Sequence, residues 1–136
     1  MASIFTKIVN GEIPAYKIAE NKDFLAFLDV NPCAPGHTLV IPKKEVDSIF
    51  DLSDELYLGL MAFAKRIEPA IRQAVPCKRV AVAVIGLEVP HAHVHLIPIS
   101  SLADMDFTKK IKPTPQELTA VASRIQANIP SSVLNG

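Results

Sequence analysis

The chain carries the segment VPHAHVHLIPI at residues 89–99, where three of its four histidines alternate with apolar residues. Successive side chains of a β-strand point to opposite faces, and each residue adds about 3.3 Å. The alternation predicts a buried strand with His91, His93 and His95 on one face, about 6–7 Å apart. Histidine has an unperturbed pKa of about 6.5, so it can act as a neutral nucleophile, a proton donor or a metal ligand near neutral pH. We therefore expect this strand to carry the chemistry of the protein.

The composition predicts a single soluble domain. The chain has 136 residues, of which 49% are hydrophobic, and this is enough to close one core. Fourteen basic residues balance fourteen acidic ones, which excludes a general nucleic-acid binder. The start is too polar for a signal peptide and no apolar run approaches the roughly 20 residues of a membrane span, so we expect a cytoplasmic protein without a membrane partner. Cys33 and Cys77 form no CxxC pair and are expected to be free thiols.

Apolar and β-branched runs bounded by turn formers predict four more strands. These strands cover residues 15–20, 23–30, 37–42 and 80–85. Asn21-Lys22 joins the first two as a hairpin, and the run at 80–85 is typical of a central strand that pairs with the histidine segment. Consecutive strands with short connections favour an α+β fold with an antiparallel sheet.

Two helices are predicted. Apolar residues at helical spacing indicate a helix over residues 53–74, with Ser53 as its N-cap, and Pro69 is expected to kink or end it. Pro113-Thr114-Pro115 introduces a second helix at residues 116–128. The short apolar segment at residues 4–9 is assigned to no element.

The histidine cluster has three interpretations on the residues alone. Alternate histidines of a strand can share a zinc ion, but His91 and His95 lie about 13 Å apart at their Cα atoms on a regular strand, so a site there needs outside ligands such as Glu88 or His37. The histidines can instead be satisfied by backbone groups, although three amphipathic rings on one face are costly without a function. The third interpretation is catalysis at phosphorus, because a neutral imidazole attacks a phosphoryl centre without first losing a proton.

The segment HAHVHLI at residues 91–97 resembles the signature of the histidine triad (HIT) family, in which three histidines alternate with apolar residues. The similarity extends to blocks at residues 4–14, 27–32 and 34–43, covers about residues 3–99, and is closest to the Hint branch. The resemblance implies one HIT domain over residues 1–136, with an antiparallel sheet of about five strands and a central helix. The helix predicted from the residues after Pro113 is then an extra C-terminal extension within residues 113–130. The resemblance also implies a homodimer.

The resemblance further implies a hydrolase or transferase that acts on purine nucleotides. Family members cleave nucleoside phosphoramidates or dinucleoside polyphosphates, and we expect neither a cofactor nor a metal. His93 matches the nucleophile that carries a transient nucleotidyl group, His95 matches a contact to the phosphate and leaving group, and His37 and His91 match residues that support these rings. Two alternatives stay open: a regulatory dimer that binds nucleotide without catalysis, and a metal-dependent hydrolase.

The same resemblance implies a set of nucleotide-binding residues. Asp29 matches the carboxylate that accepts the two ribose hydroxyls, although an aspartate before Asn31-Pro32 also suits a turn. Gly86 and Glu88 lie in the segment that would approach phosphate, where glycine permits close contact with the backbone. Five apolar residues match a wall for the base, and core packing would explain them equally well. They are Ile4, Phe5, Ile8, Phe27 and Val30.

The chain departs from the family pattern at two places, and its part after Ser100 resembles no block of the family. Some relatives carry a zinc-binding Cys-x-x-Cys near the start, where this chain has Ser3 and Thr6. Glu88 stands where a hydroxyl usually contacts phosphate. A carboxylate and a phosphate about 4 Å apart repel each other by roughly 4 kcal/mol. We therefore expect Glu88 to turn away, to hold a histidine cation or to select an amine-bearing substrate. The run Lys109-Lys110-Ile111-Lys112 is interpreted as a solvated face, with substrate binding as its alternative.

Overall fold

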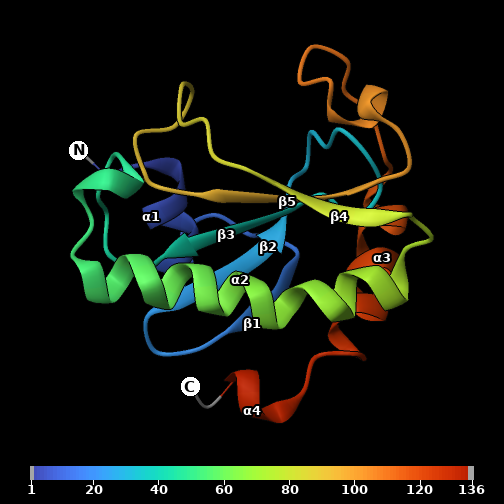
Figure 1. Cartoon of the computed structure of the whole chain (residues 1–136). Helices are drawn as coiled ribbons and strands as arrows, with labels where there is room; N and C mark the ends of the chain where they lie inside the picture. The colour runs from blue at the N-terminus through green and yellow to red at the C-terminus, as the bar shows by residue number, and fades with distance from the viewer. Residues whose placement is uncertain (1, 135–136) are drawn as a thin grey trace.

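The structure, a computed structural model, describes residues 2–134 and arranges five strands in one antiparallel sheet (Figure 1). The strands lie in the order β1-β2-β3-β5-β4, and each neighbouring pair is antiparallel. Their bounds are β1 Lys17–Glu20, β2 Phe24–Leu28, β3 Thr38–Pro42, β4 Arg79–Ala83 and β5 Val94–Ile99. The predicted α+β class, the hairpin of the first two strands and the pairing of the last two are confirmed.

The helices in chain order are α1 Ile4–Val9, η1 Ile49–Asp51, α2 Asp54–Ala74, η2 Leu102–Met105, α3 Pro115–Gln126 and α4 Ser131–Leu134. Ser53 caps α2 as predicted, because its hydroxyl accepts a hydrogen bond from the amide of Leu56 at 3.2 Å. Pro69 does not end α2, and the helix continues past it. Ile67 and Ile71 are fully buried on either side of the proline, and their burial outweighs the backbone hydrogen bond that proline removes. No helix within residues 2–134 is long and apolar enough to cross a bilayer.

The sheet separates two apolar layers, and alternate residues of each strand face opposite layers. Ala26 and Val40 belong to the layer that α2 covers, whereas Leu25 and Leu39 belong to the layer beside α1. His95 pairs with Leu39 in the register of β3 and β5, so its side chain lies on the α1 face. The histidine site therefore forms on the face of the sheet that α2 leaves open (Figure 1).

Two predictions about the strands were wrong. The histidine strand begins only at Val94, so His91 and His93 lie in the loop before it. The run at residues 80–85 forms an edge strand, not a central one, and Val82 is 54% exposed. Its apolar composition suggested a central strand, but within one chain no strand pairs with its outer edge among residues 2–134.

The short terminal helices α1 and α4 were not predicted, because each depends on contacts with the rest of the fold. The predicted C-terminal helix is present as α3, with Thr114 as its N-cap and Glu117 closing a capping box. Cys33 and Cys77 are free thiols, as expected.

Candidate functional site

His93 and His95 form the centre of the candidate site. His95 comes from the start of β5 and His93 from the residue before that strand, and their ring centroids are 5.0 Å apart. Both side chains are buried on the α1 face, and the ring of Phe5 from α1 meets His93 edge-on at 5.0 Å. Two histidines thus lie side by side, under an aromatic ring that fixes the first of them.

His91 also lies beside α1, with its ring 5.8 Å from that of Phe5, but its ring nitrogens bond away from His93 and His95. Its Nε2 lies 2.7 Å from the carbonyl of Pro42, which can only accept, so Nε2 carries the proton and donates. Burial lowers the pKa of His91 and favours the neutral ring, so Nδ1 accepts from the hydroxyl of Ser3 at 2.9 Å. The side chain of His91 is fully buried among these partners. His91 contributes to the site through its backbone carbonyl.

The backbone carbonyl of His91 fixes the protonation of His93. His93 Nδ1 lies 2.7 Å from this carbonyl, so Nδ1 carries the proton and donates. In the neutral ring, Nε2 then holds a free lone pair. His93 is therefore presented as a nucleophile whose cationic form keeps a hydrogen-bond acceptor at Nδ1.

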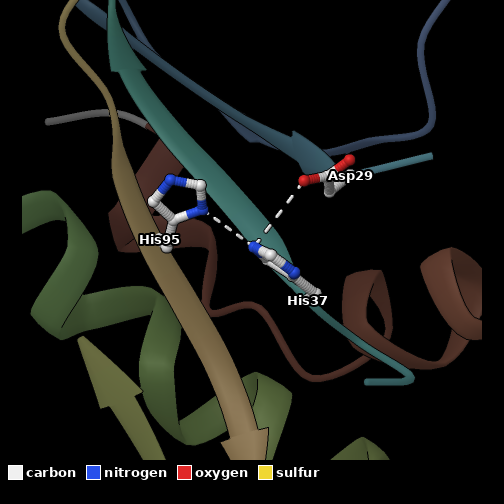
Figure 2. A group of neighbouring side chains, drawn as sticks. All are labelled: Asp29, His37 and His95. Carbon is white, nitrogen blue, oxygen red and sulfur yellow. Dashed lines mark hydrogen bonds and ion pairs between the residues drawn. The ribbon is translucent and has the colours of Figure 1, made fainter. Parts of the chain in front are cut away.

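A second chain of hydrogen bonds, which we call the histidine relay, fixes the protonation of His95. The amide of Cys33 donates to His37 Nδ1 at 3.0 Å, so the proton of neutral His37 is on Nε2. That Nε2 donates to His95 Nδ1 at 2.9 Å, which leaves the His95 proton on Nε2 (Figure 2). His95 therefore presents an N–H donor, whereas His93 presents a lone pair.

Burial keeps the relay uncharged. Burial, with smaller contributions from neighbouring positive charges, lowers the pKa of His37 to about 3 and that of His95 to about 4. Both rings are therefore neutral at neutral pH, which the alternating donors and acceptors of the relay require.

Asp29 directly follows β2 and stands beside the relay. Its Oδ1 accepts from the amide of Asn31 at 2.8 Å, and its Oδ2 lies 3.7 Å from His37 Nε2 (Figure 2). Burial raises the pKa of Asp29, while the Asn31 hydrogen bond opposes the rise. The local turn expected from Asn31 is present, and the second carboxylate oxygen faces the site.

A cavity of about 390 Å³ opens next to these groups and gathers the residues expected to bind nucleotide. His93 and His95 line it, whereas His37 and His91 lie behind its wall. The other lining residues that the sequence singled out are Asp29, Val30, Phe27, Ile4, Phe5, Ile8, Gly86 and Glu88. The structure thus brings all eight together around one cavity, Glu88 among them.

The lining also includes residues that the sequence did not single out as nucleotide-binding, two of them from the last third of the chain. Phe107 and Lys110 belong to the segment after β5, which matched no sequence pattern, yet both line the cavity. Residues 109–112 are exposed, as expected for a solvated face, and Lys110 also lines the cavity. Phe107 carries a weak signal in hindsight, because it is an isolated aromatic residue in a polar segment.

Ser3, Thr6, Glu45 and His91 form a hydrogen-bonded cluster that we call the N-terminal latch. The amide of Ser3 and the hydroxyl of Thr6 both donate to Glu45 Oε1, at 2.7 Å and 2.6 Å. The hydroxyl of Ser3 caps α1 by accepting from the amide of Thr6 at 3.0 Å, and it donates to His91. These hydrogen bonds, first that of the Thr6 hydroxyl, lower the pKa of Glu45 to about 2.

The latch does not fit the zinc ion that a Cys-x-x-Cys pair would bind. Zinc prefers thiolate, imidazole and carboxylate ligands, and hydroxyls replace both thiolates here. The hydroxyls of Ser3 and Thr6 and both ring nitrogens of His91 already have hydrogen-bond partners. The latch connects α1 to the histidine loop without a metal.

Asp29, His37 and His95 offer another arrangement to a metal, since their ligand atoms lie within 4.8 Å of one another. A metal ligand must present a lone pair, but His37 Nε2 carries the proton that it donates to His95. Moving that proton to Nδ1 would set it against the N–H of Cys33. The hydrogen bonds therefore favour the relay over a metal site.

Comparisons with known proteins agree with this arrangement. The model of the HIT domain family matches residues 10–102. The chain is 40% identical over 98 residues to an adenosine 5'-monophosphoramidase of Saccharomyces cerevisiae, covering 71% of this chain and 62% of the yeast protein. A Hit-like protein from Bartonella henselae, solved with an unknown ligand, gives a TM-score of 0.81 at 31% identity over 92% of this chain and 94% of that one. A Zn-bound histidine triad family protein from Mycobacterium smegmatis gives a TM-score of 0.80 at 29% identity, over 93% and 92%.

Proposed function

This chain belongs to the HIT domain family, and on that premise we propose that it hydrolyses or transfers nucleoside monophosphates, with His93 as the nucleophile. The substrates would be purine nucleoside phosphoramidates or dinucleoside polyphosphates. One observation carries the proposal: neighbouring rings present opposite functions to one cavity, a lone pair on His93 Nε2 and an N–H on His95 Nε2. The yeast relative named as an adenosine 5'-monophosphoramidase supports a phosphoramidate as the substrate.

The first step would form a nucleotidyl-histidine. His93 Nε2 attacks the α-phosphorus, and the bond from phosphorus to the leaving nitrogen breaks as the new bond forms. The His91 carbonyl stabilises the resulting cation through Nδ1, and His95 Nε2 donates a hydrogen bond to a phosphoryl oxygen or to the leaving atom. The leaving amine takes a proton from solvent.

The second step would release the nucleoside monophosphate. Water attacks the phosphorus and the bond to His93 Nε2 breaks, which restores the lone pair. The attacking water loses a proton to solvent, so the proton consumed in the first step is returned. Phosphorus neither gains nor loses electrons in the cycle, and no cofactor is needed.

The other end of the cavity suits a nucleoside. Asp29 offers a carboxylate oxygen to a ribose diol, since both hydroxyls can donate to it. The apolar side chains of α1 and β2 offer a wall for the base. Replacing Asp29 with alanine should weaken the binding of a ribonucleotide more than that of its deoxy analogue, and an equal loss would contradict the ribose role.

Glu88 favours a second candidate function, a nucleotide-binding module without turnover. Glu88 lines the same cavity as His93, and its carboxylate would repel a phosphate placed close to it. The same carboxylate would attract an amine-bearing leaving group, which is compatible with catalysis. Turnover of amine-bearing and neutral substrates by Glu88→Gln separates these roles.

A homodimer belongs to the same proposal. β4 is an edge strand, and exposed apolar residues lie on it and just after it, with Val82 at 54% and Ile85 at 46% exposure. Covering them with a second copy would reduce exposed apolar area and protect the strand edge. Sedimentation should show a dimer, and a monomer at micromolar concentration would contradict this part.

The test of the proposed activity is AMP release from an adenosine phosphoramidate in the presence of EDTA. We expect release by the natural protein and its loss in His93→Ala, because the variant lacks the nucleophile. Release that EDTA abolishes would support a metal-dependent hydrolase instead. Nucleotide binding without release would support the binding module.

A further inference from the structure

The segment of residues 100–113 folds back over the histidine site after β5. The ring of Phe107 meets His95 edge-on, with centroids 5.1 Å apart, and meets His37 at 6.1 Å. The amide of Ile111 donates to the carbonyl of Pro32 at 3.0 Å, in the loop that leads to His37. The segment is therefore held at two points, once on the relay and once on the loop beside it.

Lys110 lies between these two points of attachment and lines the cavity together with His93 and His95. Its ammonium stands 5.0 Å from the centre of the Phe107 ring, in a cation–π contact. Lys110 is an exposed residue, and such contacts are weak at exposed sites. The flexible stem of lysine lets the ammonium leave the ring for a stronger, anionic partner.

The described lining of the cavity contains one strongly basic side chain, that of Lys110. Among the described residues that line the cavity, Asp29 and Glu88 are acidic and Lys110 is the single lysine or arginine. His95 is neutral at neutral pH because burial lowers its pKa to about 4. An anionic group bound beside His93 and His95 would therefore find its positively charged partner in Lys110.

The charge of Lys110 already acts on the groups of the site. Burial raises the pKa of Asp29, whereas the Asn31 amide and the charge of Lys110 oppose the rise. Burial, His93 and Lys110, in that order, lower the pKa of His95. The ammonium is therefore close enough to interact with both the ribose end and the histidine end of the cavity.

We propose that Lys110 binds the non-bridging oxygens of the α-phosphate and makes the site specific for nucleotides over nucleosides. The identity of this ligand rests on the proposed function. Phe107 and the Ile111 amide act as positioning groups, because they hold the segment that carries the ammonium at the histidine end of the cavity. The positive charge of Lys110 would thus attract the phosphate and offset its repulsion by Glu88.

The test compares Lys110→Met with Lys109→Met in calorimetric titrations with AMP and with adenosine. Lys109 is the adjacent exposed lysine and does not line the cavity, so it is a matched control. We expect Lys110→Met to weaken AMP binding by about tenfold or more and to leave adenosine binding within about twofold, whereas Lys109→Met changes neither. Lys110→Arg should retain most of the affinity for AMP.

Salt provides an independent readout of the charge. In the natural protein, the preference for AMP over adenosine should decrease as ionic strength rises, because salt screens exposed charges. In Lys110→Met this decrease should be absent or much smaller. A merely structural role of Lys110 would not change the salt dependence.

Unchanged AMP affinity in Lys110→Met, or an equal loss of AMP and adenosine affinity, would overturn the assignment of Lys110. If the natural protein still releases AMP from a phosphoramidate, such a result would leave the proposed function intact. A natural protein that binds neither AMP nor adenosine would instead contradict the nucleotide site, and both proposals with it.

Discussion

The N-terminal latch and the histidine relay both flank His93, and they use the same kind of histidine for different ends. His91 and His37 are fully buried, neutral, and protonated on Nε2. His91 Nε2 donates a hydrogen bond to the carbonyl of Pro42, so its ring bonds only to groups that do not face the cavity. His37 donates to another imidazole, so its orientation is passed on to an N–H at the cavity. The partner of Nε2 thus decides whether a buried histidine stabilises the fold or sets up a reactive group.

Breaking the relay at His37 should have the largest effect. His37→Met removes the donor to His95 Nδ1, so His95 can place its proton on either nitrogen and no longer presents a fixed donor. We expect kcat for phosphoramidate cleavage to fall by about 100-fold, in line with the usual contribution of a positioned acid or base.

His37→Gln is the control, because its terminal amide can donate from about the position of Nε2. We expect it to recover about tenfold of the loss in kcat. Equal activities of the two variants would show that the donor at this position does not matter, and the relay would lose its role.

Breaking the latch should reduce stability more than activity. Ser3→Ala removes both the N-cap of α1 and the hydrogen bond to buried His91 Nδ1, and we expect it to lower the free energy of unfolding by about 2–3 kcal/mol. Ser53→Ala removes an N-cap alone, from α2, and should cost about 1 kcal/mol. Denaturant titrations measure both values. Equal losses would mean that Ser3 does not stabilise His91.

Acid should weaken the two systems in different pH ranges. The pKa values of His37 and His95 are lowered to about 3 and about 4, so the unfolded chain binds these protons first. The free energy of unfolding should therefore fall as the pH drops from about 6.5 toward 4 for His95 and toward 3 for His37. The pKa of Glu45 is lowered to about 2, so its contribution is present above about pH 4.5 and is lost as the pH falls through 2.

Variants separate these two ranges. His37→Gln should flatten the fall between about pH 6.5 and 3, whereas Glu45→Gln should flatten only the fall below about pH 4.5. Unfolding measured across this pH range checks both expectations. A steeper fall in either variant than in the natural protein would contradict the assigned direction of the pKa shift.

The sheet and α2 were predictable because their signals are local. The apolar runs at Phe24–Leu28 and Thr38–Pro42 and the helical spacing of residues 53–74 each identify an element without knowledge of the rest of the chain. The failure at Pro69 is also physical, since a local rule for proline cannot include the tertiary burial of Ile67 and Ile71.

The candidate site was only partly predictable from the sequence. The motif drew attention to His93 and His95, but the orientation of His91 depends on Ser3, which lies 88 residues earlier. The contacts of Phe107 and Lys110 depend likewise on how the segment after β5 folds back. Hydrogen bonds between distant segments leave no periodic pattern in a sequence, so the protonation of each histidine required the structure.

The opposite protonation of His93 and His95 is the centre of this account, and nitrogen NMR tests it directly. Long-range proton–nitrogen correlation spectra of the ¹⁵N-labelled protein at neutral pH distinguish the two neutral forms of each histidine. The account predicts a proton on Nδ1 in His93 and on Nε2 in His95, His37 and His91. A proton on Nε2 of His93, or on Nδ1 of His95, would contradict it.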